Sequence, residues 1–216
     1  MKKITNQMGI WHGKFGREYT ERNPQTVKEL ESLYRKCYGI TRTEMNSEFL
    51  CKIDSSAKIL EVGSNIGIQL LCLQKMGFKN LYGIELQWYA VEQSKRKTKK
   101  INIIQGSAFD IPFKDNFFDL VFTSGLLIHI SPRDINDVLD EIYRCSRKYI
   151  WGFEYYSNYC TEVVYRGKSN LLWKNDFAKL YIQRFPDLRL IKERKFKYLD
   201  SENVDSMFLL EKKGIK

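Results

Sequence analysis

Histidine, proline and cysteine are all scarce in this chain of 216 residues, which contains two histidines, four prolines and five cysteines. The histidines are His12 and His129, and no cysteine pair has the Cys-x-x-Cys spacing, so the sequence excludes a histidine-rich metal site and implies no metal. The odd number and wide spacing of the cysteines argue against a disulfide framework and indicate a reduced, cytoplasmic protein. Because no apolar run reaches about 18 residues, we expect no membrane span, and the N-terminus lacks the apolar segment of a secretory signal.

The composition is that of a globular protein, with 43% hydrophobic and 29% charged residues. The formal net charge of +10 suits an anionic partner, such as a nucleic acid, an acidic metabolite or an acidic lipid, and it equally suits an enzyme with a basic surface. Positive charge is densest at residues 95–100, which we expect at the solvent-facing end of a helix. An RNA-binding patch is the alternative, although no aromatic side chains are interleaved there.

The first fifty residues are expected to be helical. Asn23 and Pro24 have the pattern of a helix start, Gly39 is a suitable stop, and Thr41 with Glu44 predicts a capping box for the next helix. The segment 11–19 mixes aromatic, glycine and charged residues and does not fit a plain helix. We therefore expect residues 1–54 to form an N-terminal helical cap or lid on a core formed by residues 55–216.

From residue 58 onwards, short apolar strands alternate with helices. Strands are predicted at 58–62, 81–85, 101–105, 118–124, 148–154, 188–196 and 207–212. Helices are predicted at 66–77, 88–100, 135–143 and 176–185. This alternation predicts an α/β fold with a doubly wound, mostly parallel, seven-stranded Rossmann-like sheet that ends in an antiparallel C-terminal hairpin. We expect the whole chain to be one domain, with a coenzyme site at the carboxyl ends of the early strands.

A glycine-containing loop follows the first predicted strand. Gly63 allows a sharp turn, Gly67 allows the next helix to pack closely, and the backbone N–H groups at the start of that helix favour an anion. Glu85 ends the second predicted strand, where a carboxylate can accept hydrogen bonds from both ribose hydroxyls of an adenosine. The coenzyme could be a dinucleotide or S-adenosylmethionine, and a tight turn without a ligand is the structural alternative.

The downstream segments resemble class I S-adenosylmethionine-dependent methyltransferases. The matching stretches are ILEVGSNIG (59–67), LYGIEL (81–86), GSAFDIPFKDNFFDLVFTSGLLIHI (106–130) and FLLEK (208–212). The resemblance implies that S-adenosylmethionine is the cofactor and S-adenosylhomocysteine its product. It also implies that the loop with Ser64 contacts the cofactor and that Ser124, at the end of the fourth strand, lines the methionine moiety.

Two residues depart from the pattern of that family. Asn65 replaces the middle glycine of the loop, but Asn tolerates the left-handed backbone better than most residues. Ser107 stands where an acidic residue often holds the adenine amino group. We therefore expect the Ser107 hydroxyl and the Ala108 backbone to bind adenine, with Leu86 and Phe109 packing against it.

A second resemblance extends outside the core. QMGIWHGKFGREYTERNP (7–24), LIHISP (127–132), IYRCSRKYIWGFEYYS (142–157) and VVYRGKSNLLWKNDF (164–177) are similar to the methylases associated with pseudaminic acid biosynthesis. The similarity implies a small, anionic, sugar-derived acceptor in a nonulosonic acid or surface glycan pathway. An RNA methyltransferase and a methyltransferase-like binding protein without activity are the alternatives.

His129 follows the fourth strand, where the transferred methyl group is expected to emerge. Its imidazole is a candidate general base, because its ordinary pKa lies near neutrality, and the alternative is a packing histidine. In the cap, the candidate cofactor-binding residues are Trp11, Tyr19 and Arg22. Aromatic side chains exclude water, and Tyr19 or Arg22 can meet the methionine carboxylate. A fixed N-terminal arm is the alternative there.

Five further residues are candidates for binding the acceptor. One lies in the cap, two end the fifth strand and two lie in the long connection after it: His12, Tyr155, Tyr156, Tyr165 and Arg166. Arg166 is expected to hold a carboxylate or phosphate of the acceptor with two hydrogen bonds, and the alternative is a surface arginine.

Overall fold

The computed structural model describes residues 3–214, and its centre is a seven-stranded sheet. The strands of this sheet are β1 (Lys58–Val62), β2 (Asn80–Glu85), β3 (Ile101–Gln105), β4 (Phe118–Ser124), β5 (Ser146–Tyr155), β8 (Leu188–Lys197) and β9 (Val204–Lys212). Their spatial order is β3-β2-β1-β4-β5-β9-β8, in which the first five are parallel and β9 is antiparallel to both of its neighbours. The predicted Rossmann-like fold with an antiparallel C-terminal hairpin is therefore confirmed.

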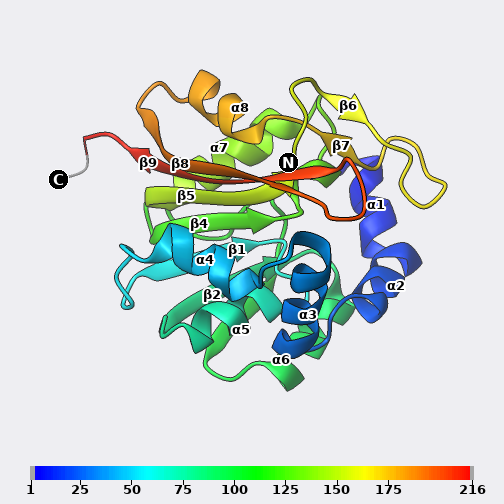
Figure 1. Cartoon of the computed structure of the whole chain (residues 1–216), viewed down its shortest axis with the longest axis horizontal. Coiled ribbons are helices and arrows are strands. Elements are labelled where there is room, and N and C mark those ends of the chain that lie inside the picture. Colours follow the sequence, from blue (N-terminus) through cyan, green and yellow to red (C-terminus); the bar gives the residue numbers. More distant parts are fainter. Residues whose placement is uncertain (1–2, 215–216) are drawn as a thin grey trace.

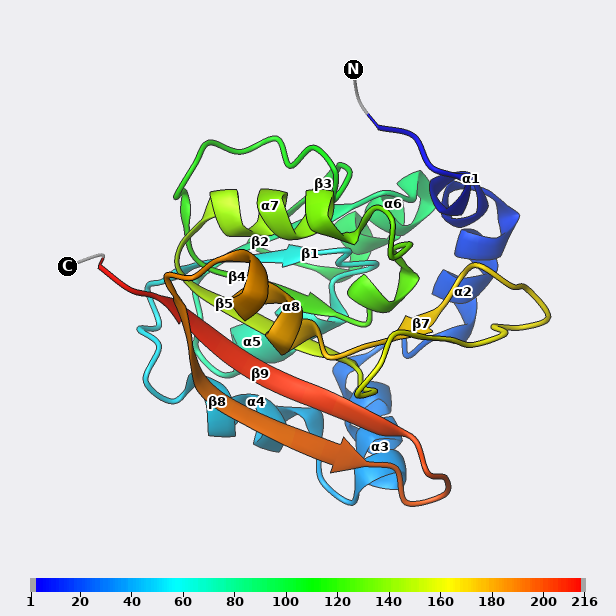
Figure 2. The ribbon, with the colours of Figure 1, turned by 90° about the horizontal axis from the view of Figure 1, so that it is seen from above.

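Helices cover both faces of the sheet (Figure 1). Their bounds are α1 (Asn6–His12), α2 (Lys14–Arg22), α3 (Val27–Tyr38), α4 (Arg42–Leu50), α5 (Ile68–Lys75), α6 (Trp88–Lys97), α7 (Ile135–Cys145) and α8 (Phe177–Arg184). Figures 1 and 2 show α7 and α8 on one face and α3, α4 and α5 on the other. The short helix α1 and its neighbour α2 lie beyond the sheet, beside the two-residue strand β7 (Trp173–Lys174).

Each face of the sheet has its own apolar core. One core joins α3, α4 and α5 to residues such as Ile59 and Leu120, and the other joins α7 and α8 to residues such as Leu60 and Val121. Successive side chains of a strand point to opposite faces, so a parallel strand covered on both sides must be apolar throughout. Residues 59–62 of β1 are buried without interruption, which explains why these strands read as continuous apolar runs.

The N-terminal helices begin and end largely as the sequence predicted. Gly39 ends α3 with a φ of +78°, and the capping box of α4 is formed, with Thr41 N–H donating to Glu44 and Glu44 N–H donating to the Thr41 hydroxyl. The predicted start of α3 at Pro24 is wrong. The Thr26 side chain accepts from the backbone N–H of Glu29 and begins the helix there, while Asn23 caps the end of α2.

The sequence predicts that residues 11–19 do not form one plain helix, and the structure divides them between two short helices. The segment forms the end of α1 and most of α2, with a break at Gly13, whose extended backbone ends the first helix and starts the second. A Cβ atom at Gly16 would lie 1.8 Å from the backbone oxygen of Trp11, so only glycine allows the two helices to approach this closely. The glycines that argue against one plain helix therefore separate the two helices at Gly13 and let them pack closely at Gly16.

The C-terminal hairpin places two distant segments side by side. β9 pairs with β5 so that Asp205 lies opposite Tyr155, at the edge of the sheet where the parallel strands end. The connection between β5 and α8 adds a small two-stranded sheet of β6 (Thr161–Glu162) and β7, which the sequence did not predict. Within residues 3–214, no helix has the length and apolar character needed to cross a membrane.

Candidate functional site

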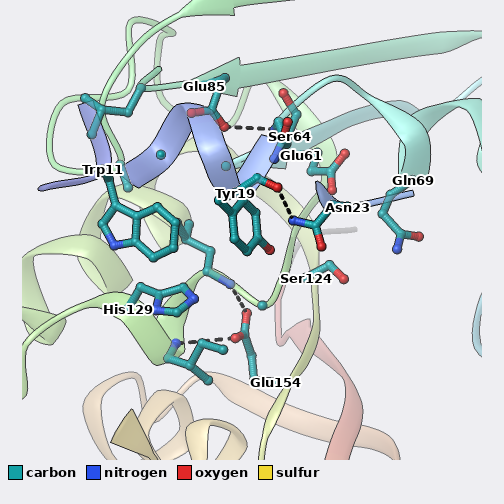
Figure 3. A pocket seen from close by; sticks show the side chains of 18 of the residues that line it. Trp11, Tyr19, Asn23, Glu61, Ser64, Gln69, Glu85, Ser124, His129 and Glu154 are labelled. Atoms are coloured by element: carbon teal, nitrogen blue, oxygen red, sulfur yellow. Dashed lines mark hydrogen bonds between the residues drawn. The ribbon is translucent and has the colours of Figure 1, made fainter. Parts of the chain in front are cut away.

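A cavity of about 450 Å³ lies along the edge of the sheet at which the parallel strands end (Figure 3). The strand ends form its floor, and α1, α2 and α3 contribute its other walls. One part, which we call the glycine-loop half, is formed by residues of the segments 61–69 (without Val62 and Gly67), 84–87 and 106–109. The other part, the β5–β9 half, is formed by residues of α1, α2 and α3, by residues of the segments 124–131 (without Leu127) and 153–155, and by Tyr165, Leu172, Tyr198 and Asp205.

The glycine loop has the backbone geometry that its sequence predicted. Gly63, Asn65 and Gly67 have φ angles of +76°, +47° and +81°, so Asn65 does adopt the left-handed conformation. A Cβ atom at Gly63 would lie 2.8 Å from a methyl carbon of Leu126, and one at Gly67 would lie 2.6 Å from a methyl carbon of Ile103. Gly67 is the N-cap residue of α5 and does not line the cavity, whereas Gly63, Ser64 and Asn65 do.

Glu85 connects the end of β2 to the glycine loop. One carboxylate oxygen accepts from the Asn65 N–H at 2.8 Å and the other from the Gln87 N–H at 2.7 Å. Burial raises the pKa of Glu85, and these backbone N–H groups oppose the rise. Each oxygen can accept a second hydrogen bond, so Glu85 both holds the loop and keeps acceptors for two ribose hydroxyls.

Glu61 was not predicted as a site residue, although it lies in the quoted motif and lines the cavity. Its side chain is only 2% exposed, and its Oε2 has no hydrogen-bond partner within the described residues. Burial raises the pKa of Glu61 well above its usual range, while the positive charge of Arg42 acts in the opposite direction. The buried Ser64 hydroxyl is also unpartnered, so two polar groups of this half are available to a ligand.

The segment expected to contact adenine folds as a tight turn. Ser107 and Asp110 form an isolated bridge, and the Ser107 hydroxyl accepts from the Phe109 N–H at 3.1 Å. Ser107, Ala108 and Phe109 all line the cavity, as does Leu86 from the end of β2. Since the hydroxyl uses only an oxygen lone pair in this turn, its hydrogen remains available to a nitrogen acceptor of a ligand.

His129 ends the short helix η1 (Leu127–His129), directly after β4, and lines the β5–β9 half. Its Nδ1 lies 2.8 Å from the carbonyl oxygen of Leu171. A carbonyl can only accept, so Nδ1 carries the hydrogen and the neutral ring presents a lone pair at Nε2. Burial lowers the pKa of His129 to about 4, which keeps the ring neutral near pH 7.

Glu154, at the end of β5, fixes the loop that carries His129. Its carboxylate accepts from the Leu126 N–H at 3.2 Å and, more weakly, from the Ile128 N–H at 3.4 Å (Figure 3). The side chain is 2% exposed, and burial raises its pKa to about 7 while these hydrogen bonds oppose the rise. Glu154 thus acts on the site mainly by positioning the backbone before His129.

The aromatic residues of α1 and α2 close one side of the cavity. The Trp11 ring lies 4.4 Å from the His129 ring and 5.1 Å from the Tyr19 ring, measured between centroids. Tyr165, from the connection after β6, lies 5.4 Å from His129 on the same side. The structure therefore brings together four predicted site residues from three distant segments of the sequence, and all four line the cavity.

Two of the other predicted cap residues lie outside the cavity wall. The Arg22 guanidinium packs against the rings of Tyr19 and Phe15, at 5.3 and 5.5 Å from their centroids, instead of facing the cavity. The backbone carbonyl of His12 accepts from the Gln87 side chain at 3.2 Å and so fastens α1 to the end of β2. These contacts give both residues a part in holding the cap.

The predicted acceptor residues divide in the same way. Tyr155 lines the cavity, as does Ser124, which was expected to contact the cofactor, whereas the Tyr156 hydroxyl bonds to Asn158 outside the cavity. Arg166 is exposed in a tight turn between Tyr165 and Lys168, with a φ of +50°. Tyr165 in the same turn lines the cavity and Arg166 does not, so the expected contact between Arg166 and an anionic acceptor stays a prediction without support from the cavity wall.

The charge of the cavity wall also differs from the expectation. Within residues 3–214, the wall contains four carboxylates and no lysine or arginine side chain. The carboxylates are those of Glu61, Glu85, Glu154 and Asp205. The basic surface that dominates the net charge lies elsewhere, for example in the last turn of α6. The prediction of an anionic acceptor is thus not supported by any cation in the wall.

The described residues contain no group of three or more His, Cys, Asp or Glu side chains that could hold a metal ion.

Comparison with known proteins identifies the class of the fold. Residues 60–149 match a family model described as a methyltransferase domain, and this segment includes the glycine loop, Glu85 and His129. The structure is similar to that of 1,6-didemethyltoxoflavin-N1-methyltransferase from Burkholderia thailandensis, solved with 1,6-didemethyltoxoflavin and S-adenosylhomocysteine. That similarity has a TM-score of 0.72 and 12% identity over 98% of this chain and 92% of that chain.

Two further solved structures show the same fold. An S-adenosylmethionine-dependent methyltransferase from Anabaena variabilis is similar with a TM-score of 0.70 and 10% identity, over 99% of this chain and 98% of that chain. The PH0226 protein from Pyrococcus horikoshii is similar with a TM-score of 0.68 and 16% identity, over 91% and 99%. Residues 60–149 thus match a methyltransferase domain, and the chain has the fold of these enzymes, which supports S-adenosylmethionine as its cofactor.

The glycine-loop half fits this cofactor. The unpartnered Glu61 Oε2 suits the ammonium group of the methionine part, and Glu85 suits the ribose hydroxyls. Gly63 and Asn65 adopt the left-handed backbone conformation, and Gly63 has no Cβ atom between its backbone and the cavity. When bound, the cofactor supplies an electrophilic methyl group on a sulfonium.

Proposed function

We propose that this protein transfers a methyl group from S-adenosylmethionine to a small, sugar-derived acceptor bound in the β5–β9 half of the cavity. The observation that carries the proposal is that one cavity joins the glycine-loop half, with Glu85, to the β5–β9 half, with His129. In this reaction the acceptor atom displaces the sulfonium, the methyl–sulfur bond breaks, and the acceptor loses a proton. Holding the reactants in line in a closed aromatic pocket is the main source of acceleration.

His129 is the residue that we propose as the proton acceptor. The hydrogen bond to Leu171 fixes the tautomer, and the neutral ring leaves the Nε2 lone pair for the acceptor's proton. Trp11 and Tyr165 pack on the ring and limit the access of water. Glu154 keeps the loop in place through the backbone of Leu126 and Ile128.

The resemblance to the pseudaminic acid-associated methylases supports a sugar-derived acceptor in a nonulosonic acid or surface glycan pathway. The anionic character expected from the net charge does not enter the proposal, because no lysine or arginine of residues 3–214 lines the cavity. All five cysteines are free thiols, which supports a cytoplasmic location.

Ligand binding and turnover test the proposal in sequence. S-adenosylhomocysteine should raise the thermal unfolding temperature, and NAD at the same concentration should not. Release of S-adenosylhomocysteine should then be measured with a panel of small sugar acceptors and with total RNA. Equal stabilisation by NAD, or turnover with RNA alone, would contradict the proposal.

A further inference from the structure

The β5–β9 half extends into a pocket that the proposed transfer does not yet use. Its walls are Tyr38 at the end of α3, Tyr155 at the end of β5, Tyr198 before the last strand, and Asp205 in β9. Neighbouring strands lie about 4.8 Å apart, so β9, three strands from β1, is about 14 Å from the glycine loop. This distance places the pocket beyond the residues that fit the cofactor.

The four side chains form one connected group. The Tyr38 hydroxyl donates to Asp205, and the Tyr198 hydroxyl lies 3.2 Å from that of Tyr155. The Tyr38 and Tyr198 rings meet edge to face at 4.8 Å between centroids, and the Tyr155 and Tyr198 rings lie 5.8 Å apart. Three electron-rich rings and a carboxylate therefore surround one end of the cavity.

Asp205 is 4% exposed and still lines the cavity. Burial raises its pKa to about 6, against the effects of Tyr38, Tyr198, Arg42 and Lys174, so it is mostly ionised near pH 7. A carboxylate accepts up to about four hydrogen bonds, so the bond from Tyr38 leaves room for a ligand.

Neither of the two cations whose charge acts on Asp205 lines the cavity. The Lys174 ammonium bonds to Asn203 and lies 5.2 Å from the Tyr155 ring centroid, and it does not line the cavity. Arg42 is fully buried behind the wall, where its guanidinium donates to Asn46 at 2.9 Å and to the Tyr34 hydroxyl at 3.0 Å. Neither side chain is therefore placed to receive an anion inside the cavity.

We propose that the pocket of Tyr38, Tyr155, Tyr198 and Asp205 binds an ammonium group of the methyl acceptor, so that the acceptor is an amine-bearing compound. This inference rests on the proposed function. An ammonium pairs with Asp205 by charge-assisted hydrogen bonds and is attracted to the faces of the tyrosine rings. A carboxylate or phosphate at the same place would be repelled by Asp205, with no lysine or arginine in the described wall to compensate.

The test compares three sugars that differ in charge. Glucosamine, N-acetylglucosamine and glucuronate are titrated by calorimetry at pH 7.0 and constant ionic strength into the full-length protein loaded with S-adenosylhomocysteine. We expect glucosamine to bind at least tenfold more tightly than the other two. Asp205→Asn should lower the glucosamine affinity at least tenfold and leave that of N-acetylglucosamine unchanged.

A second variant keeps the test independent of folding effects at Asp205. Tyr198→Leu removes one ring of the pocket and leaves the carboxylate, and it should weaken glucosamine binding severalfold. Affinity for S-adenosylhomocysteine is measured for each variant, and it should stay within twofold of that of the unaltered protein.

The outcomes separate the two proposals. If the unaltered protein fails to bind S-adenosylhomocysteine, the proposed function itself is contradicted. If it binds S-adenosylhomocysteine but glucuronate or N-acetylglucosamine binds as well as glucosamine, or none of the three sugars binds, the ammonium pocket is overturned. An unchanged preference for glucosamine in both variants overturns the assignment to these residues.

Discussion

The two halves of the cavity are assembled from the chain in different ways. The glycine-loop half is nearly local in sequence, because β1, its loop, β2 and the turn after β3 follow one another within residues 58–109. The β5–β9 half combines α1, α2, α3, η1, the end of β5, Tyr165 and the start of β9, which are spread over almost the whole chain. Local patterns can describe the first half, whereas the second exists only when distant segments pack together.

The halves also differ in what holds their polar groups. Glu85 is bound by backbone N–H groups of its own half, and Glu61 keeps an unpartnered oxygen there. In the β5–β9 half, Glu154 and Asp205 are tied to backbone or tyrosine groups from other elements. Changes in the first half should thus alter cofactor binding, and changes in the second should alter turnover and acceptor choice.

The largest expected effect is on turnover, at His129. His129→Ala should lower kcat by about 10²- to 10⁴-fold, as expected for loss of a general base, without changing the affinity for S-adenosylhomocysteine. Since burial lowers the pKa of His129 to about 4, the ring is fully deprotonated before neutral pH. The dependence of kcat on pH should therefore show no change from His129 above about pH 6.

His129→Gln is the matched control, because its amide can still donate to the Leu171 carbonyl but cannot take up a proton as imidazole does. Recovery of full turnover in this variant would show that His129 only positions the loop or the acceptor.

The next effect concerns stability and pH at Glu154. Its pKa is raised from 4.5 to about 7, so the folded protein holds this proton more tightly than the unfolded chain. The stabilisation is complete below about pH 4 and is lost as pH rises through about 7, a change on the order of 3 kcal/mol. Glu154→Gln cannot titrate, so the stability difference between variant and unaltered protein should shift in favour of the variant from pH 5 to pH 8.

Denaturant unfolding at several pH values, with the cofactor absent, measures this difference. A stability difference that stays constant from pH 5 to pH 8 would show that Glu154 does not carry the shifted pKa.

At Glu85 the expected change is in cofactor affinity. Glu85→Ala should weaken binding of S-adenosylhomocysteine by about tenfold or more, since hydrogen bonds to a charged group contribute about 1.5–3 kcal/mol. Asp205→Asn is the matched variant in the β5–β9 half and should leave this affinity unchanged. Calorimetry on both proteins tests the separation, and equal losses in the two variants would contradict it.

A smaller effect is expected in the cap. Gly16→Ala places a Cβ atom 1.8 Å from the Trp11 carbonyl oxygen, so α1 and α2 must move apart, at a net cost of about 1–2 kcal/mol. Hydrogen exchange at residues 8–23 should become faster in this variant.

In the unaltered protein, added cofactor should slow hydrogen exchange over the same residues. Exchange that does not respond to the cofactor would indicate that residues 8–23 form a fixed arm.

The smallest effect is expected on the basic surface. Replacing Lys95, Arg96 and Lys99 by serine should change stability by less than about 0.5 kcal/mol and leave turnover nearly unchanged, because these residues lie at or beyond the exposed end of α6. If RNA were the substrate, the same variant would bind more weakly and with a flatter dependence on salt, by about one phosphate contact for each residue removed. Assays at two salt concentrations distinguish these results.

Much of the fold could be predicted because its signals are local. The apolar runs of the parallel strands, the left-handed positions at Gly39, Gly63 and Gly67, and the capping box at Thr41 each depend on a few neighbouring residues. The start of α3 is an exception, because the Thr26 side chain, and not that of Asn23, accepts from the first turn of this helix. Gly13 and Gly16 argue against one plain helix through residues 11–19, and the structure shows that they allow two short helices to meet at close range.

The candidate site likewise has one part that local sequence signals predict and one part that depends on packing. Glu85 and the glycine loop were recognisable from order and spacing, and the structure brings them within hydrogen-bond distance. Nothing in the sequence linked Tyr38 and Tyr198 to Asp205, since their contact depends on α3 and the C-terminal hairpin meeting at the end of β5. Arg166 was placed correctly after β5, but the tight turn directs Tyr165, and not Arg166, towards the cavity.

The sequence by itself determined the class of fold and the cofactor half of the site, because backbone conformation and strand burial are set by residues close together in the chain. Only the tertiary structure decided the charge of the cavity. The chain carries a net charge of +10, yet the described wall of its cavity contains carboxylates and no lysine or arginine. Net charge sums over all side chains, whereas a ligand meets only those that folding directs inward, and an unpaired lysine or arginine is costly to bury.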